Sequence, residues 1–249
     1  MPDFSQFSPH LSQFWVYLSA SPLLGLTITL CAYVVAQAIY ARCKYSPLAN
    51  PVAIAIALVS LALLASGMSY QRYFAGAQFV HFLLGPATVA LAVPLARQLP
   101  RMRRAFLPLL GALLTGCVTA IVSAVSVVLL LGGSEQLART VGPKSATTPI
   151  AMAVSEGLKG VPALTAVLVI STGIFGAATA RFLFNAMKIE SHAARGFALG
   201  LAGHGVGTAR AFQVSAEMGA FAGLGMGLNG IMTAVLAPWL VPLMLRLLG

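Results

Sequence analysis

Long apolar segments separated by short polar connections make up almost the whole chain. Stretches that contain no Lys, Arg, Asp or Glu recur over residues 4–40, 45–71, 73–96, 105–133, 160–180 and 218–245. A membrane-spanning helix needs about 20 mostly apolar residues, and the alternating pattern of a membrane β-barrel is not seen along these stretches. The pattern therefore predicts an all-α polytopic membrane protein with about six or more spans.

Glycine, proline and polar residues interrupt the apolar pattern at three places. Gly85-Pro86 divides the third apolar stretch, Gly142-Pro143 opens the polar segment GPKSATTPIAMAVSE, and the third interruption is GHGVGTARAF around Gly205. Proline removes a backbone donor and clashes with the preceding turn, and the residue before it avoids helical angles. Since a long span follows each interruption, we predict a transporter-like internal repeat of a broken or re-entrant half-helix and a full span. The alternative is that Gly-Pro pairs only kink ordinary helices.

The interruptions are not spread evenly over what we expect to be a single integral membrane domain. Residues 21–72 contain two uninterrupted apolar stretches and are predicted to form two plain spans that serve as a scaffold. Residues 73–249 contain all three interruptions and are predicted to form a broken-helix transport core. Residues 1–10 carry Asp3 and neither Lys nor Arg, so the basic region of a signal peptide is missing and the first span is expected to stay in the mature protein.

Composition and charge agree with a membrane environment. Hydrophobic residues are 59% of the chain and charged residues only 8%, whereas a soluble domain has about 25% charged residues. The net charge is +10, and many basic residues gather in short connections such as residues 42–44 and 97–104. This is the pattern of cytoplasmic loops beside anionic lipid. We therefore expect the lipid bilayer, and no nucleic acid, as the partner of these charges.

The segment from Lys144 to Thr148 has the composition of an anion-binding half-helix. Irregular backbone at membrane depth survives only where protein or a water-filled cavity surrounds it. In transporters, half-helix N-termini direct the positive end of the helix dipole at anionic solutes. Pro149 favours a first helical turn, Thr148 is expected to cap it, and Ser145 and Thr147 would add hydroxyl donors. The alternative is that these hydroxyls only satisfy their own backbone or join helices.

Ionisable groups are rare in the apolar segments, and each is a candidate for function. Arg210 could bind a carboxylate through two parallel hydrogen bonds, or form a structural ion pair with Glu156 or Glu217. His204 could bind solute or relay a proton, or it could simply be satisfied by a neighbouring carbonyl. Asn229 is the one strong polar group in a glycine-rich stretch, and we expect it to link helices rather than to bind a ligand.

The sequence lacks the arrangements that are typical of enzymes. Ser145 lacks the flanking glycines of a nucleophile elbow, no pair of carboxylates is placed for acid–base catalysis, and no set of His, Asp and Glu has the spacing of a metal site. The cysteines at positions 31, 43 and 117 show neither paired nor metal-type spacing. We therefore expect no enzymatic activity, no metal and no cofactor.

Four segments together resemble the LrgB/CidB family of bacterial membrane proteins. They are PKSATTPIAMAVSE, GHGVGTARAF, FLLGPATVALAVPL and SPLANPVAIAIALV, and the resemblance extends from about Ser21 to the C-terminus. The chain departs from the family at Gly203, where members often have Ser before the motif histidine. The motif match implies the site residues Lys144, Ser145, Thr147, Thr148, His204, Gly207, Thr208 and Arg210. The interruptions themselves add Thr88 and Glu156 to the predicted site, and place the helix breaks at Gly85, Pro86, Gly142, Pro143 and Gly205.

The resemblance implies two functions of different kinds. The family is linked to antiholin-like control of murein hydrolase export and cell lysis, while similar plastid proteins carry glycolate and glycerate. It also implies the bacterial cytoplasmic (inner) membrane, a small LrgA/CidA-type membrane partner and a homo-oligomer, expected to be a dimer. A pore-forming holin needs no dedicated binding site, so charged and hydroxyl residues on broken segments favour a secondary transporter or exporter of small carboxylates. A holin- or antiholin-like regulator is the alternative.

Overall fold

The computed structural model describes residues 23–46, 49–83, 86, 89–90 and 92–248. Every regular element among these residues is an α-helix, which confirms the predicted all-α class. The helices are α2 (Leu23–Arg42), α3 (Pro51–Ser66), α4 (Tyr70–Phe82), α6 (Ala92–Arg104), α7 (Phe106–Leu130), α8 (Glu135–Val141), α9 (Thr148–Gly157), α10 (Pro162–Ala186), α11 (His192–Val214) and α12 (Ala216–Leu248).

Four of the described helices, α2, α7, α10 and α12, are long and apolar enough to cross a membrane. They carry large apolar side chains on their outer surfaces, for example Leu107 (76% exposed), Phe175 (70%) and Trp239 (77%). A helix satisfies its own backbone hydrogen bonds, so it can present such side chains to lipid at no cost in unpaired polar groups. The chain is therefore a multi-pass helical membrane protein. The shorter apolar helix α3 has 16 residues.

The chain divides into two compact units, one ending at Ala90 and the other beginning at Leu91. The first contains α2, α3 and α4, and its turns follow directly from sequence. Asn50 caps α3 by accepting hydrogen bonds from the amides of Val52 and Ala53, and Gly67 ends that helix in the left-handed conformation. Gly25 allows the backbone of Tyr73 on α4 to approach α2 more closely than a Cβ atom would permit.

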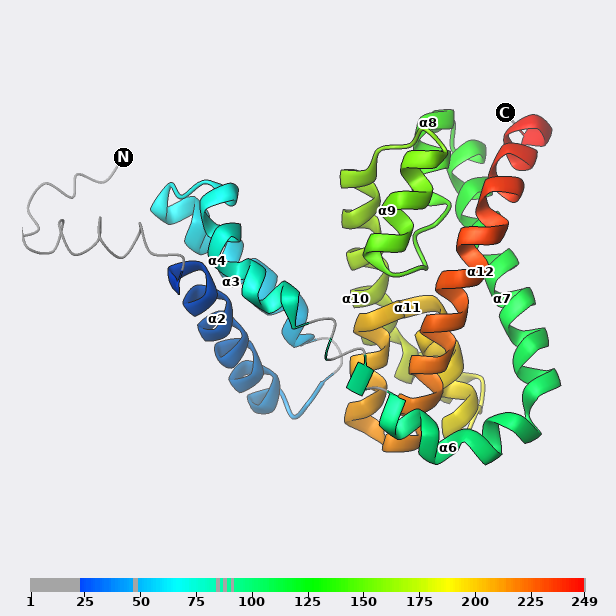
Figure 1. Cartoon of the computed structure of the whole chain (residues 1–249), viewed down its shortest axis with the longest axis horizontal. Coiled ribbons are helices and arrows are strands. Elements are labelled where there is room, and N and C mark those ends of the chain that lie inside the picture. Colours follow the sequence, from blue (N-terminus) through cyan, green and yellow to red (C-terminus); the bar gives the residue numbers. More distant parts are fainter. Residues whose placement is uncertain (1–22, 47–48, 84–85, 87–88, 91, 249) are drawn as a thin grey trace, which may run out of the picture. The chain divides into compact units, whose positions relative to one another are not determined.

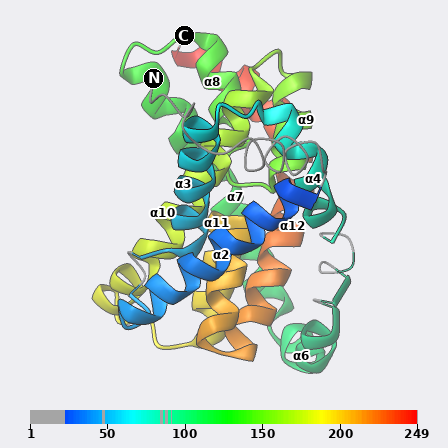
Figure 2. The same cartoon turned by 90° about the vertical axis from the view of Figure 1, so that its left-hand side faces the viewer.

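The second unit contains three spanning helices, α7, α10 and α12, with a broken segment between each consecutive pair. Helices α8 and α9 lie at the end of the unit where α12 finishes, whereas α6 and α11 lie at the end where α12 begins (Figures 1 and 2). The two broken segments thus enter this unit from opposite ends. The predicted alternation of broken segments with full spans is present here.

Helix α11 is a hairpin of two arms rather than a straight rod. His204 has a non-helical backbone (φ 41°, ψ −131°) between the arms. Nδ1 of His192, at the start of α11, lies 3.0 Å from Oγ of Ser215, just beyond its end, whereas a straight helix would separate these residues by about 35 Å. The predicted break is confirmed, but it falls on His204 and not on Gly205.

The segment α8–α9 forms the second hairpin, and a non-helical connection from Gly142 to Thr147 separates its arms. Thr140, near the end of α8, accepts a hydrogen bond at Oγ1 from the amide of Val161, which caps α10 (3.0 Å). Thr165 on α10 reinforces this junction, since its Oγ1 lies 3.0 Å from the Thr140 carbonyl oxygen and 2.7 Å from Oγ of Ser155. The break predicted at Gly142-Pro143 is therefore confirmed.

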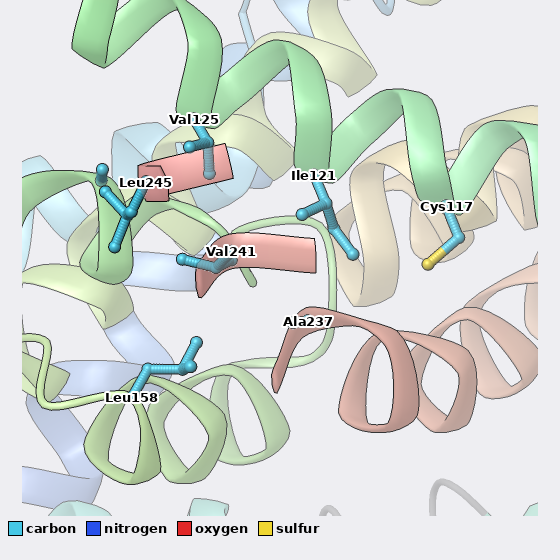
Figure 3. Packing of buried hydrophobic residues seen from close by; sticks show 8 residues of the cluster. Cys117, Ile121, Val125, Leu158, Ala237, Val241 and Leu245 are labelled. Atoms are coloured by element: carbon cyan, nitrogen blue, oxygen red, sulfur yellow. The ribbon is translucent and has the colours of Figure 1, made fainter. Parts of the chain in front are cut away.

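Apolar packing anchors the α8–α9 hairpin to the spanning helices. Figure 3 shows side chains from α7 and α12 meeting Leu158, which follows α9. The cluster consists of Cys117, Ile121, Val125, Ala138, Leu158, Ala237, Val241 and Leu245. Burying each large side chain of such a cluster stabilises the fold by about 1.5–3 kcal/mol, so this packing holds the hairpin against α7 and α12.

Glycines allow the first arm of α11 to pack directly on α12. A Cβ atom at Gly196 or Gly200 would clash with the backbone carbonyls of Met218 or Ala222, and one at Gly225 would lie 2.5 Å from the carbonyl oxygen of Phe197. Such close backbone approach is typical of helix pairs in membranes. Gly225, in the glycine-rich stretch of α12, therefore lies at a close contact between the two helices.

Candidate functional site

Asn229, in the interior of α12, connects the two hairpins near their tips. Its Nδ2 donates one hydrogen bond to the carbonyl oxygen of Ser145, in the α8–α9 connection, and another to that of Leu201, near the end of the first arm of α11, each at 3.0 Å. The link between helices that the sequence predicted for Asn229 is confirmed. Its position at the meeting point of both breaks was not predicted, although a lone Asn among glycines in an apolar helix is the signal that marks it.

The other polar atom of Asn229, Oδ1, accepts no hydrogen bond from any residue that the structure describes. Asn229 is 1% exposed, and Oδ1 is a buried oxygen without a hydrogen bond among the described residues. Turning the amide over would place this oxygen against two carbonyl oxygens, so the hydrogen-bond network fixes the orientation. An unpaired buried acceptor costs about 1–3 kcal/mol, and such a group in a native protein calls for a donor from water, an ion or a ligand.

The N-terminus of α9 lies directly beside this junction. Ala151 donates the first backbone bond of the helix, to the carbonyl of Thr147 at 2.8 Å. The amides of Thr148 and Ile150 precede the helical ladder, and Pro149 has no amide hydrogen. The expected cap at Thr148 was wrong by one residue, because the N-cap is Thr147 and Thr148 is the first helical residue. Thr147 makes no side-chain capping bond, so the helix end retains donors.

The hydroxyl groups around the start of α9 differ in whether they make hydrogen bonds. Oγ of Ser145 lies 3.5 Å from Nζ of Lys144, and Ser145 is 6% exposed. Thr147 and Thr148 are half-buried, and their hydroxyls make no hydrogen bond within the described part of the chain. Lys144 is also half-buried and forms no ion pair with any described carboxylate. The structure thus brings four predicted site residues together around one half-helix N-terminus.

The turn between the arms of α11 contains three predicted site residues, His204, Gly207 and Thr208, and the structure shows what each of them contacts. Nε2 of His204 lies 2.7 Å from the carbonyl oxygen of Val169, so the alternative of a histidine satisfied by a neighbouring carbonyl is the one observed. Thr208 directs its hydroxyl to the His204 carbonyl at 2.8 Å, and Gly207 makes room for the carbonyl of Leu199. All three are buried, and together they shape the turn between the arms of α11.

Two of the remaining predicted site residues, Glu156 and Arg210, lie away from this junction. Glu156 is exposed in the last turn of α9, about 12 Å along the helix from Thr148. Arg210 is about 9 Å along the second arm of α11 from His204, donates to Oε1 of Gln213 at 3.1 Å and lines a different cavity. Glu217, one of its two predicted ion-pair partners, binds Arg101 at 3.1 Å.

Of the predicted break residues at Gly85-Pro86 and Gly142-Pro143, the second pair is fully described and the first only in part. Gly85 and Thr88 lie outside the described residues, and Pro86 between them is exposed and belongs to the first unit. Gly142 and Pro143 are buried, and a Cβ atom at Gly142 would lie 2.7 Å from Cγ2 of Val241. Among the described residues no group of three or more His, Cys, Asp or Glu could hold a metal ion.

Comparison with known proteins gives a consistent result. The model of a family described as LrgB-like matches residues 29–243. The chain is 28% identical over 222 residues to the antiholin-like protein LrgB of Bacillus mycoides (strain KBAB4), covering 89% of this chain and 96% of that protein. With the same coverage it is 27% identical to the proteins of that name from Bacillus cereus (strain B4264) and Bacillus anthracis (strain CDC 684 / NRRL 3495). No solved structure matches.

Proposed function

This chain belongs to the LrgB-like family, whose model covers residues 29–243, and we propose that it is a secondary transporter of small carboxylates. The solute site lies where the tips of the two hairpins meet on α12. The observation that carries this proposal is Asn229, which joins both tips through Nδ2 and keeps Oδ1 as a buried acceptor with no described partner.

The N-terminus of α9 supplies the anion-binding part of the site. Backbone amides that precede the helical ladder and the positive end of the helix dipole favour a carboxylate at this position. Thr147 and Thr148 add hydroxyl donors with no described partner, and Lys144 adds a full positive charge. The donors come from one short segment, so a small carboxylate can engage several of them at once.

Asn229 supplies the complementary acceptor and the means of gating. A solute hydroxyl, such as that of glycolate, glycerate or lactate, can donate to Oδ1 and remove the cost of the unpaired oxygen. The two Nδ2 bonds hold the hairpin tips together when the site is closed. Because the hairpins enter from opposite ends of the unit, moving one tip at a time would open the site to one side at a time, as alternating access requires.

An antiholin-like role is the second candidate, and the comparisons favour it more directly than transport. The relatives named above are all called antiholin-like proteins. In this role the chain would control a membrane lesion or the release of a lytic enzyme. The hairpin geometry does not require such a role, because a lesion-forming assembly needs no half-helix N-terminus beside a buried acceptor. For either function, we propose that the chain lies in the bacterial inner membrane, works beside a small LrgA/CidA-type membrane protein and forms a homodimer.

Reconstitution separates the two functions. The full chain is purified, placed in liposomes and assayed for counterflow of labelled glycolate, glycerate, lactate and pyruvate, with acetylcholine as a cationic control solute. Saturable counterflow of the carboxylates alone is the expected result. The same chain and its Asn229→Leu variant are then expressed in bacteria, and autolysis and murein hydrolase activity in the medium are measured. Absence of counterflow together with altered autolysis would replace transport by the antiholin-like function.

A further inference from the structure

A cavity of about 420 Å³ lies in the second unit beside the base of the α11 hairpin. Three arginines line it from three segments: Arg181 on α10, Arg195 on the first arm of α11 and Arg210 on the second arm. The described residues that line the cavity include neither Asp nor Glu. Three positive charges therefore share one small space whose walls contribute no carboxylate.

Arg195 is held in place by neutral groups. Its Nη2 donates to Oδ1 of Asn185 at 2.8 Å, its Nε donates to the carbonyl of Ile189, and the guanidinium lies 5.8 Å from the centre of the Phe184 ring. These contacts fix the direction of the side chain without cancelling its charge. A guanidinium that is oriented in advance loses less conformational entropy when it binds an anion.

The chemistry of the cavity fits a phosphate group. Guanidinium forks match phosphate oxygens through pairs of parallel hydrogen bonds, and such charge-assisted bonds are among the stronger polar contacts in proteins. The volume is within the range of about 300–1,000 Å³ for ligand pockets, and it exceeds the needs of a two- or three-carbon acid. The cavity is also separate from the junction of the hairpin tips at Asn229.

The surroundings of the cavity indicate where such a phosphate would come from. On α10, Phe182 and Leu183 directly follow Arg181 in the sequence and are 54% and 56% exposed, so the helix that carries this arginine also presents large apolar side chains on its surface. The basic helix α6, with Arg101, Arg103 and Arg104 in its last turn, lies at the same end of the unit (Figure 1). Basic pockets between spanning helices on the cytoplasmic side are typical sites for anionic head groups.

We propose that this arginine cavity binds the phosphate of an anionic ligand, and that the ligand is an anionic phospholipid head group from the adjacent leaflet. The proposal does not depend on transport of carboxylates. Arg181 is the residue to test, since it is exposed and its replacement leaves the contacts of Arg195 intact.

The test uses the full chain in neutral detergent. Native mass spectrometry counts retained phosphatidylglycerol, and the melting temperature is measured with added phosphatidylglycerol, phosphatidylcholine, inorganic phosphate or pyrophosphate. We expect phosphatidylglycerol, and not phosphatidylcholine, to bind and to raise the melting temperature. Arg181→Gln should weaken phosphatidylglycerol binding by roughly tenfold, the effect of one charge-assisted contact.

Arg103→Gln is the matched control, because it removes the same charge from an exposed arginine at the same end that does not line the cavity. It should retain phosphatidylglycerol like the parent. Equal binding by Arg181→Gln and the parent, or equal losses in Arg181→Gln and Arg103→Gln, would overturn the site. Stabilisation of the parent but not of Arg181→Gln by inorganic phosphate or pyrophosphate alone would support a phosphate site and overturn the assignment to lipid.

Discussion

The side-chain amide of Asn229 donates a 3.0 Å hydrogen bond to the backbone carbonyl of Ser145, 84 positions earlier in the chain. Its second hydrogen bond, to Leu201, brings the other hairpin to the same point. One side chain therefore determines how two broken segments from opposite ends of the unit meet. Any motion that separates the tips must break at least one of these bonds.

Replacing Asn229 by Leu tests this relationship. The change keeps the approximate size of the side chain, removes both donors and leaves two buried carbonyl oxygens without this partner. We expect a loss of stability of about 1–3 kcal/mol for each carbonyl left unpaired, measured as a lower melting temperature in detergent, and loss of carboxylate counterflow. Thr233→Val, one turn further along α12 and also buried, contacts neither hairpin tip through a described hydrogen bond and should retain both properties.

Gly173 on α10 should be intolerant of any side chain. A Cβ atom there would lie 2.5 Å from Cε1 of His204, so Gly173→Ala must displace the imidazole from the Val169 carbonyl or shift the helix. We expect a cost of about 1–3 kcal/mol. Gly176→Ala is the matched control on the same helix, since the nearest atom would lie 3.7 Å away. It should be neutral or slightly stabilising, because Ala favours helix over Gly.

Engineered disulfides can show that α11 is a hairpin within the membrane. In a chain whose cysteines at positions 31, 43 and 117 are replaced by Ala or Ser, the pair His192→Cys and Ser215→Cys should cross-link readily, because these side chains meet at 3.0 Å. The pair His192→Cys and Ala202→Cys should not cross-link, since about 15 Å of helix separates them. Mass spectrometry of the oxidised protein distinguishes the products. Cross-linking of neither pair would indicate a continuous α11.

The sequence predicted the existence of the breaks better than their residues. Proline at 143 and the glycines around His204 are local signals, and both breaks occur where such residues gather. The exact residue at the second break depends on Gly173 and Val169, which accommodate the imidazole from another helix, and no local pattern contains that information. The separation of Arg210 from Lys144, which the sequence placed in one site, also depends on contacts between distant segments. Arg210 and Lys144 occur in similar polar segments, but the fold-back of α11 places Arg210 beside α10 and away from α9.

The hydroxyls and the charge at the start of α9 are expected to contribute separately to solute binding. Thr148→Val keeps the shape of the side chain and removes one donor from the proposed carboxylate site. If that hydroxyl contacts the solute in a buried site, its loss should cost about 1–3 kcal/mol, which is about one to two decades in the apparent constant for counterflow. The same change at Thr147 would test the N-cap position that the structure assigns. Both variants should keep the melting temperature of the parent, since neither hydroxyl makes a described hydrogen bond.

Lys144→Gln should weaken carboxylate binding less than Thr148→Val does. The effect of Lys144→Gln should be larger at low salt than at high salt, because salt ions screen the charge of Lys144 more strongly as the ionic strength rises. Counterflow measured over a series of salt concentrations gives both comparisons from one set of liposomes. Glu156→Gln is the control, since it changes a charge on the same helix at its exposed far end. It should follow the parent at every salt concentration. If Thr148→Val and Lys144→Gln also transported like the parent while autolysis of the host changed, the half-helix would not bind the solute, and the antiholin-like function would account for these residues better.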